Sequence, residues 1–151
     1  MSAQLPIDET TFCDMTRLYG KSFNLPPLAA KIYAYLMFDF ERKGLTFDDL
    51  VDIFSASKSS VSTNLNLLIN NNLIQDINKL DERKRYFTIN ENYVKIRFQG
   101  ISERLKEEAK IMDSLINFHQ HISEEEKRRA KIFQNLLKSN IENIEKSLSQ
   151  L

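Results

Sequence analysis

The segment from residue 45 to residue 90 constrains the fold most, because it places two short amphipathic helices directly before a charged hairpin. Thr46 or Asp48 can cap the first helix, and the hydroxyl-rich stretch 55–57 both ends it and suits the start of the second. Each helix repeats apolar residues at the spacing that gathers them on one face. They are Phe47, Leu50, Val51 and Phe54 in the first helix and Val61, Leu65, Leu68 and Ile69 in the second.

A hairpin is expected after the second helix, which ends in three asparagines at 70–72. Asparagine tolerates the left-handed conformation that a helix end requires. Apolar and β-branched residues on either side of a turn at 81–84 predict two strands. They are Leu73, Ile74, Ile77 and Leu80 in the first strand and Arg85, Tyr86, Phe87, Thr88 and Ile89 in the second. Helix, turn, helix and hairpin in this order predict a winged helix-turn-helix, a mainly α fold with a small β wing.

The exposed positions of this segment carry groups that suit double-stranded DNA. Hydroxyl and amide groups on the second helix can hydrogen-bond base edges, whereas a lysine there suits a phosphate. Cations at the hairpin tip suit phosphates or a narrow minor groove. Either set alone is most often plain solvated surface, but their order along the chain favours DNA. The candidate DNA-binding residues are Lys58, Ser59, Ser60, Ser62, Thr63 and Asn64 on the helix, and Lys79, Arg83, Lys84 and Arg85 on the hairpin.

Three stretches carry a resemblance to a known family. They are Pro-Pro-Leu followed by AAKIYAYLMF at residues 26–38, the helix SKSSVSTNLNLL, and the hairpin DERKRYFTI. Over residues 25–90 the chain resembles the MarR-type winged-helix regulators of bacteria, most closely their GbsR-like branch. This resemblance implies a transcriptional regulator in which Asp81 orients Arg83 for a contact with DNA.

The same resemblance implies a small-molecule effector as a further partner, bound between the winged part and the dimerisation part. Aromatic side chains could wall such a site. The alternative, which is favoured, is that these aromatic residues belong to the ordinary core. The residues concerned are Tyr19, Phe23, Tyr33, Tyr35 and Phe98.

Helical segments frame the winged DNA-binding domain, which we expect at residues 26–90. Residues 1–25 hold an N-terminal helix for packing or dimerisation. Residues 91–151 hold two long helices whose apolar residues recur close to heptad spacing and exceed what a small domain can cover. A homodimer would bury them, and the alternative is that the two helices fold back on each other within one chain. The expected dimerisation residues are Phe133, Leu137, Ile141, Ile144 and Leu148.

Composition and motifs narrow the remaining function classes. The 21 basic and 21 acidic residues balance, so any attraction to DNA must come from local clusters. His119 and His121 are two residues apart and would point to different faces of a helix, which is poor geometry for binding a metal. Only three glycines are present, so the sequence has no glycine-rich phosphate-binding loop. We therefore expect no catalytic site, no metal and no cofactor. No apolar run is long enough to span a membrane, the N-terminus lacks a leader pattern, and the lone Cys13 fits a reducing compartment, so a cytoplasmic location is expected.

Two functions from different classes follow from these observations. The first is a sequence-specific DNA-binding transcriptional regulator that acts as a homodimer on an inverted-repeat operator. The second is a winged-helix module that binds another protein and not DNA, which the neutral net charge favours. Salt dependence separates them, because phosphate contacts make duplex affinity fall steeply with salt.

Overall fold

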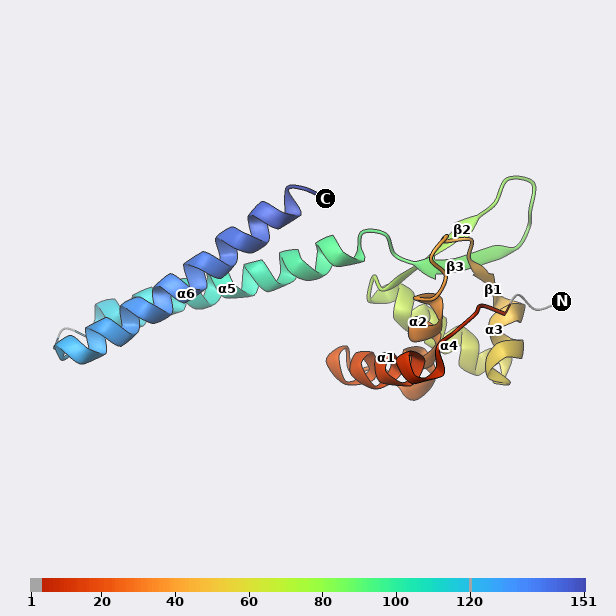
Figure 1. The fold of residues 1–151 in the computed structure, drawn as a ribbon, viewed down its shortest axis with the longest axis horizontal. Coiled ribbons are helices and arrows are strands. Elements are labelled where there is room, and N and C mark those ends of the chain that lie inside the picture. The colour runs from red at the N-terminus through yellow and green to blue at the C-terminus, as the bar shows by residue number, and fades with distance from the viewer. Residues whose placement is uncertain (1–3, 120) are drawn as a thin grey trace. The chain divides into compact units, whose positions relative to one another are not determined.

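The computed structural model describes residues 4–119 and 121–151. Residues 1–3, which belong to the N-terminal segment that lacks a leader pattern, lie outside the described residues. Two compact units are present, Met1–Tyr93 and Val94–Leu151. The elements, in chain order, are α1 (Glu9–Ser22), α2 (Pro27–Leu36), β1 (Leu45–Thr46), α3 (Phe47–Phe54), α4 (Lys58–Asn70), β2 (Ile74–Asn78), β3 (Arg85–Ile89), α5 (Tyr93–Phe118) and α6 (Glu124–Leu148) (Figure 1).

The predicted fold class is confirmed: helices α3 and α4 form the helix-turn-helix, and the β2–β3 hairpin is the wing. Thr46, not Asp48, caps α3, because its hydroxyl accepts from the Asp49 amide while the Asp49 carboxylate accepts from the Thr46 amide. This reciprocal arrangement satisfies two amides that a helix start leaves without partners. Ser55 then turns the chain with a left-handed φ of 47°, and the Ser57 hydroxyl caps α4.

The core of the first unit lies between α2, α3, α4 and one face of the sheet. Helix α2 is the central element, and α1 packs against it through half-buried aromatic residues. Burial of each large apolar side chain contributes roughly 1.5–3 kcal/mol, so these contacts dominate the stability of the unit. The largest fully buried apolar residues are Tyr33, Ile32, Leu36, Leu45, Leu50, Leu68, Ile74 and Val61.

The sheet is antiparallel with the order β1-β3-β2, so the wing carries one more strand than the sequence predicts. Strand β2 ends at Asn78, which pairs with Arg85, and Leu80 is therefore not a strand residue. The prediction for Leu80 was wrong because Ile74, Ile77 and Leu80 are spaced by three, whereas a strand face repeats every two residues. Leu80 lies in the turn instead, with 94% of its surface exposed.

The loop that leads from α2 to β1 is fixed by a buried carboxylate that the sequence did not single out. Asp39 accepts hydrogen bonds from the amides of Lys43 (3.2 Å) and Gly44 (2.8 Å). Gly44 has a φ of 84°, and a β-carbon there would lie 2.8 Å from Cβ of Tyr86. Only glycine therefore lets this loop cross β3 closely enough for β1 to pair with it.

Helices α5 and α6 make an antiparallel hairpin within the second unit (Figure 1). Nε2 of Gln134 donates to Oδ1 of Asp113 at 2.7 Å, and Lys106 forms an ion pair with Glu145. Ser123 and Glu126 form a second capping box at the start of α6. The intrachain packing that the sequence left as an alternative is therefore present.

This hairpin already covers the stripe that we expected to pair with a second chain. Leu137 is buried, and the other four members, Phe133, Ile141, Ile144 and Leu148, are half-buried. A different set of large apolar residues stays exposed along the same two helices. It comprises Val94, Ile96, Phe98, Ile111, Leu115 and Phe118 of α5 and Ile132 and Leu136 of α6.

Within residues 4–119 and 121–151, no helix has both the length and the apolar character needed to cross a membrane. In the same part of the chain, no group of three or more His, Cys, Asp or Glu side chains is placed to hold a metal ion.

Candidate nucleic-acid interface

Helix α4 presents one polar face to solvent, because its apolar residues are fixed in the core. Val61, Leu65 and Leu68 are buried, so the opposite face is the one that can meet a ligand. That face is a ridge of exposed residues at positions i, i+4, i+7 and i+11. The ridge consists of Ser59, Thr63, Asn66 and Asn70.

Two members of this ridge, Asn66 and Asn70, are absent from the candidates predicted from sequence. The signal that could have found them is the helical spacing from Ser59 and Thr63. Lys58 and Ser62 flank the ridge and are exposed. Within the described chain, their side chains form no hydrogen bond or ion pair that they would lose on binding a ligand.

Other predicted residues of α4 are engaged within the helix. Nδ2 of Asn64 donates to the Ser60 carbonyl at 2.7 Å, and Asn64 is half-buried on the flank of the ridge. The Thr63 hydroxyl donates to the Ser59 carbonyl at 2.9 Å. The Ser60 hydroxyl lies 2.9 Å from the Ser57 hydroxyl, beside the helix cap. The hydrogen bond to the Ser60 carbonyl holds the Asn64 side chain against its own helix and uses one of its two amide hydrogens.

The four basic residues of the wing fall into two pairs. Arg85 is held by the sheet, because its Nε donates to Oδ2 of Asp76 at 2.9 Å and its guanidinium lies over the Phe87 ring. Lys79 is held as well, with Nζ 3.8 Å from the centre of the Tyr86 ring. Arg83 and Lys84 are exposed, and neither has an ion-pair partner among the residues that the structure describes. These two cations can reach a ligand without losing a contact.

The structure gives Asp81 a different part from the one that the resemblance implies. No ion pair joins Asp81 to Arg83 in the described chain. Asp81 instead has a φ of 66°, and the Glu82 amide donates to the Lys79 carbonyl at 3.1 Å across it. This is the pattern of φ signs and hydrogen bonding of a type II turn, which needs a residue that tolerates positive φ. The Asp81 backbone shapes the wing tip.

Glu82 is also used within the wing. Its carboxylate accepts the hydroxyl proton of Tyr86, and this hydrogen bond raises the pKa of Tyr86 above its ordinary value. The acidic residue is therefore tied back to β3 and adds rigidity between the tip and the sheet.

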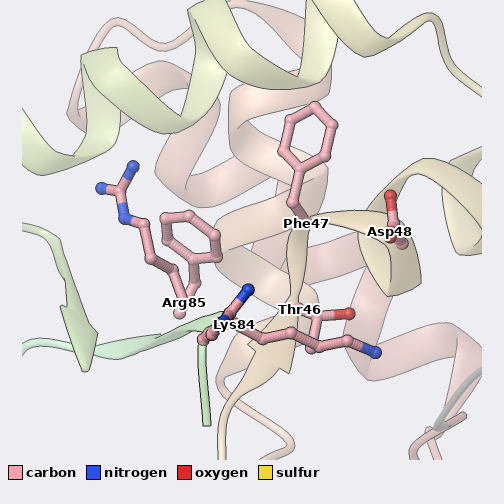
Figure 2. Close-up of a pocket in the computed structure, with 7 residues that line it drawn as sticks. Thr46, Phe47, Asp48, Lys84 and Arg85 are labelled. Carbon is pink, nitrogen blue, oxygen red and sulfur yellow. The ribbon is translucent and has the colours of Figure 1, made fainter. Parts of the chain in front are cut away.

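A pocket of about 280 Å³ lies where the wing meets the start of α3 (Figure 2). Lys84 and Arg85 border it from the hairpin, and Thr46, Phe47 and Asp48 border it from the other side. Arg83 and Phe87 complete its lining. Because Arg85 is paired with Asp76, the uncommitted cations Arg83 and Lys84 stand against the Asp48 carboxylate, and this balance favours an anionic group such as a phosphate in the pocket.

The aromatic residues considered for an effector site pack against one another. The rings of Tyr19 and Phe23 are stacked at 5.6 Å, and Tyr19 meets Tyr33 edge-on at 4.9 Å. Tyr33 and Tyr35 are buried, and the Tyr35 hydroxyl accepts from the Leu5 amide. For these four residues the packing agrees with the ordinary-core alternative. Phe98 belongs to the second unit.

No protein-family model matches the chain, and no curated protein matches its sequence. A crystal structure described as a transcriptional regulator is 21% identical and has a TM-score of 0.53, over 94% of this chain and 95% of that one. A Staphylococcus aureus MepR–DNA complex is 17% identical, with a TM-score of 0.44 and 88% of each chain covered. The adhesin competence repressor AdcR from Streptococcus pyogenes is 18% identical, with a TM-score of 0.40, over 89% of this chain and 95% of that one. At these identities the first likeness establishes a shared fold.

Proposed function

We propose that this chain is a MarR-type transcriptional regulator that binds operator DNA through α4 and the wing. One observation carries the proposal: the winged unit presents an exposed polar ridge on α4 together with two uncommitted cations, Arg83 and Lys84, on the wing. A helix in the major groove and a hairpin on the flanking backbone are the contacts that a winged helix-turn-helix can make. The GbsR-like branch rests on the SKSSVSTNLNLL motif alone.

The ridge of α4 supplies the base contacts in this proposal. Its hydroxyl and amide groups are short, so the helix backbone can approach base edges closely. Lys58, in the first turn, contacts a phosphate. The pocket beside α3 accepts a second phosphate, which Arg83 and Lys84 neutralise. Phosphate contacts at both ends of the unit would fix its register on the duplex.

A two-fold homodimer on an inverted repeat completes the proposal. The support is the apolar surface that the α5–α6 hairpin leaves exposed, above all Leu136 and Ile132 of α6 and Leu115 and Phe118 of α5. Several large apolar side chains exposed on one helical hairpin are a candidate interface, because a second copy would remove them from water. Two copies would present two α4 helices to half-sites about one helical turn apart. A regulator of this kind acts in the cytoplasm, where a small-molecule effector would reach it.

The test is selection of bound duplexes from a random DNA pool with the full-length protein. We expect an inverted repeat to be enriched, with an affinity that falls steeply as salt rises. The Arg83→Ala variant should reduce the salt slope by about one, because one phosphate contact is lost. If no duplex is enriched and binding is absent at low salt, the proposal fails.

The second candidate is a winged-helix module that binds protein. The neutral net charge favours it, as does the single cation, Lys58, on the α4 sequence. Under this alternative the ridge on α4 would meet an uncharged polar protein surface. A stable complex with a protein partner, unaffected by Arg83→Ala and accompanied by no duplex binding, would support it over DNA recognition.

A further inference from the structure

The wing ends in a large apolar side chain that its own unit leaves uncovered. Leu80 is 94% exposed, more than any other large hydrophobic residue in residues 4–119 and 121–151. Turns generally carry polar residues, because their side chains stand in water. A leucine here adds almost nothing to folding, so its position suggests a contact with another molecule.

Leu80 lies in the loop between β2 and β3, beyond the last paired residues of the wing, Asn78 and Arg85. Leu80 and Asp81 are the two central residues of the turn that the Glu82 amide closes on the Lys79 carbonyl. The left-handed Asp81 and the bond between Glu82 and Tyr86 hold this turn in one form. A small, rigid apolar tip can enter a narrow groove at little entropic cost.

The charges around Leu80 indicate which kind of molecule it contacts. Four basic residues at positions 79–85 stand against two acidic ones, and Glu82 is bonded to Tyr86. Arg83 and Lys84 carry their charge uncommitted beside the leucine. A polyanion is favoured by such surroundings, whereas an apolar protein surface would have to desolvate these cations.

We propose that Leu80 is an apolar wedge that enters the minor groove of the bound operator beside Arg83. There it packs against sugar and base edges, and it selects a deformable base step by opening it. Apolar side chains inserted between base steps bend DNA, and flexible pyrimidine–purine steps bend most easily. This inference rests on the proposed function and adds the source of sequence preference at positions that α4 does not touch.

The experiment compares full-length wild type with Leu80→Ser and Leu80→Met on the selected operator. Bending is measured by energy transfer between dyes at the duplex ends, and affinity is measured over a salt series. We expect Leu80→Ser to weaken binding about ten-fold, to straighten the DNA and to keep the salt slope, because no charge is removed. Leu80→Met conserves volume and polarity and should retain both affinity and bend. Replacing the flexible step under the wing by a stiff one should weaken wild type and leave Leu80→Ser unchanged.

The matched control is Arg83→Ala, which should lower the salt slope while the bend persists. Wild-type affinity and bending in Leu80→Ser, combined with weakened binding in Arg83→Ala, would overturn the wedge and leave the proposed function standing. A change of solution mass in Leu80→Ser would show that the leucine contacts a second copy, and would also overturn the wedge. If wild type binds no duplex, the wedge and the proposed function fail together.

Discussion

Left-handed backbone conformations at non-glycine residues shape the winged unit at its junctions. Ser55 turns α3 into α4, Asn72 turns α4 into β2, and Asp81 turns the wing tip. Such a conformation costs roughly 1–2 kcal/mol for an ordinary residue and less for Asn or Asp. Asn72 could be anticipated from its asparagine triplet. Ser55 and Asp81 could not, because their conformation follows from the packing of the elements on either side.

Asp81 gives a direct test of turn geometry against charge pairing. Asp81→Gly and Asp81→Ala both remove the carboxylate, but only glycine accepts positive φ freely. We expect Asp81→Gly to keep duplex affinity and melting temperature. Asp81→Ala should lower the free energy of unfolding by about 1 kcal/mol, because alanine does not accept the positive φ of the wing turn freely. Equal loss of duplex affinity in both variants, with unchanged melting temperatures, would instead show that the carboxylate holds Arg83.

Among side chains of its size, Asp39 should cost the most free energy of unfolding when it is removed. It is buried and accepts from two loop amides, and removing it leaves both without a partner. Asp39→Ala should therefore lower the free energy of unfolding by about 2–3 kcal/mol in urea titration. Glu41→Ala is the matched control, because Glu41 is an exposed acid in the same loop and its ion pair is with the exposed Lys43. A loss in the control as large as that in Asp39→Ala would refute the assignment.

At the scale of elements, the helices were predictable and the sheet was only partly so. The caps and the apolar spacing determine α3 and α4 locally, so their sequence alone indicates them. Strand β1 is two residues long, and it exists because Asp39 and Gly44 bring the loop onto β3. The candidate site divides in the same way. Sequence identified the basic wing, but only cross-strand partners separate the engaged Lys79 and Arg85 from the free pair.

The polar ridge of α4 predicts which asparagine affects base preference. Asn66 is exposed on the ridge, whereas Asn64 lies on its flank with Nδ2 bonded to the Ser60 carbonyl. Asn66→Ala should relax preference at one or two base positions, at a cost of about 1–3 kcal/mol if a bidentate contact is lost. Asn64→Ala should change preference less. Duplex selection with both variants measures this, and the reverse order would place the groove-facing side of α4 closer to Asn64.

At the scale of the whole molecule, one hairpin has an inner apolar face that packs within the chain and large apolar residues that stay exposed. Leu137 is 5% exposed and packs within the chain, while its neighbour Leu136 is 58% exposed. Sequence periodicity identified the stripe that contains Leu137, because its members recur every three or four residues, and it was expected to be the dimerisation surface. It could not identify the outer face, because an exposed leucine is recognised only once the packing of α5 against α6 is known.

These adjacent leucines provide a matched pair for the proposed homodimer. Leu136→Asp should give a folded, helical monomer with weakened binding to a two-half-site operator, since burial of each such side chain contributes roughly 1.5–3 kcal/mol. Leu137→Asp should instead disrupt the hairpin itself and reduce helical content. Light scattering gives the mass and circular dichroism the helicity. A Leu136→Asp variant that stays a dimer would mean that another surface joins the copies.

In the proposed homodimer, the outer apolar face would also tie the stability of this protein to its abundance. If those side chains leave water only when two copies meet, the dimer is more stable than the separated folded chains, and mass action makes the melting temperature rise with protein concentration. Operator occupancy would then fall more steeply than in proportion as the copy number drops, because only the dimer presents two α4 helices and its share of the copies also falls. Operator occupancy would therefore respond steeply to protein concentration without any added ligand.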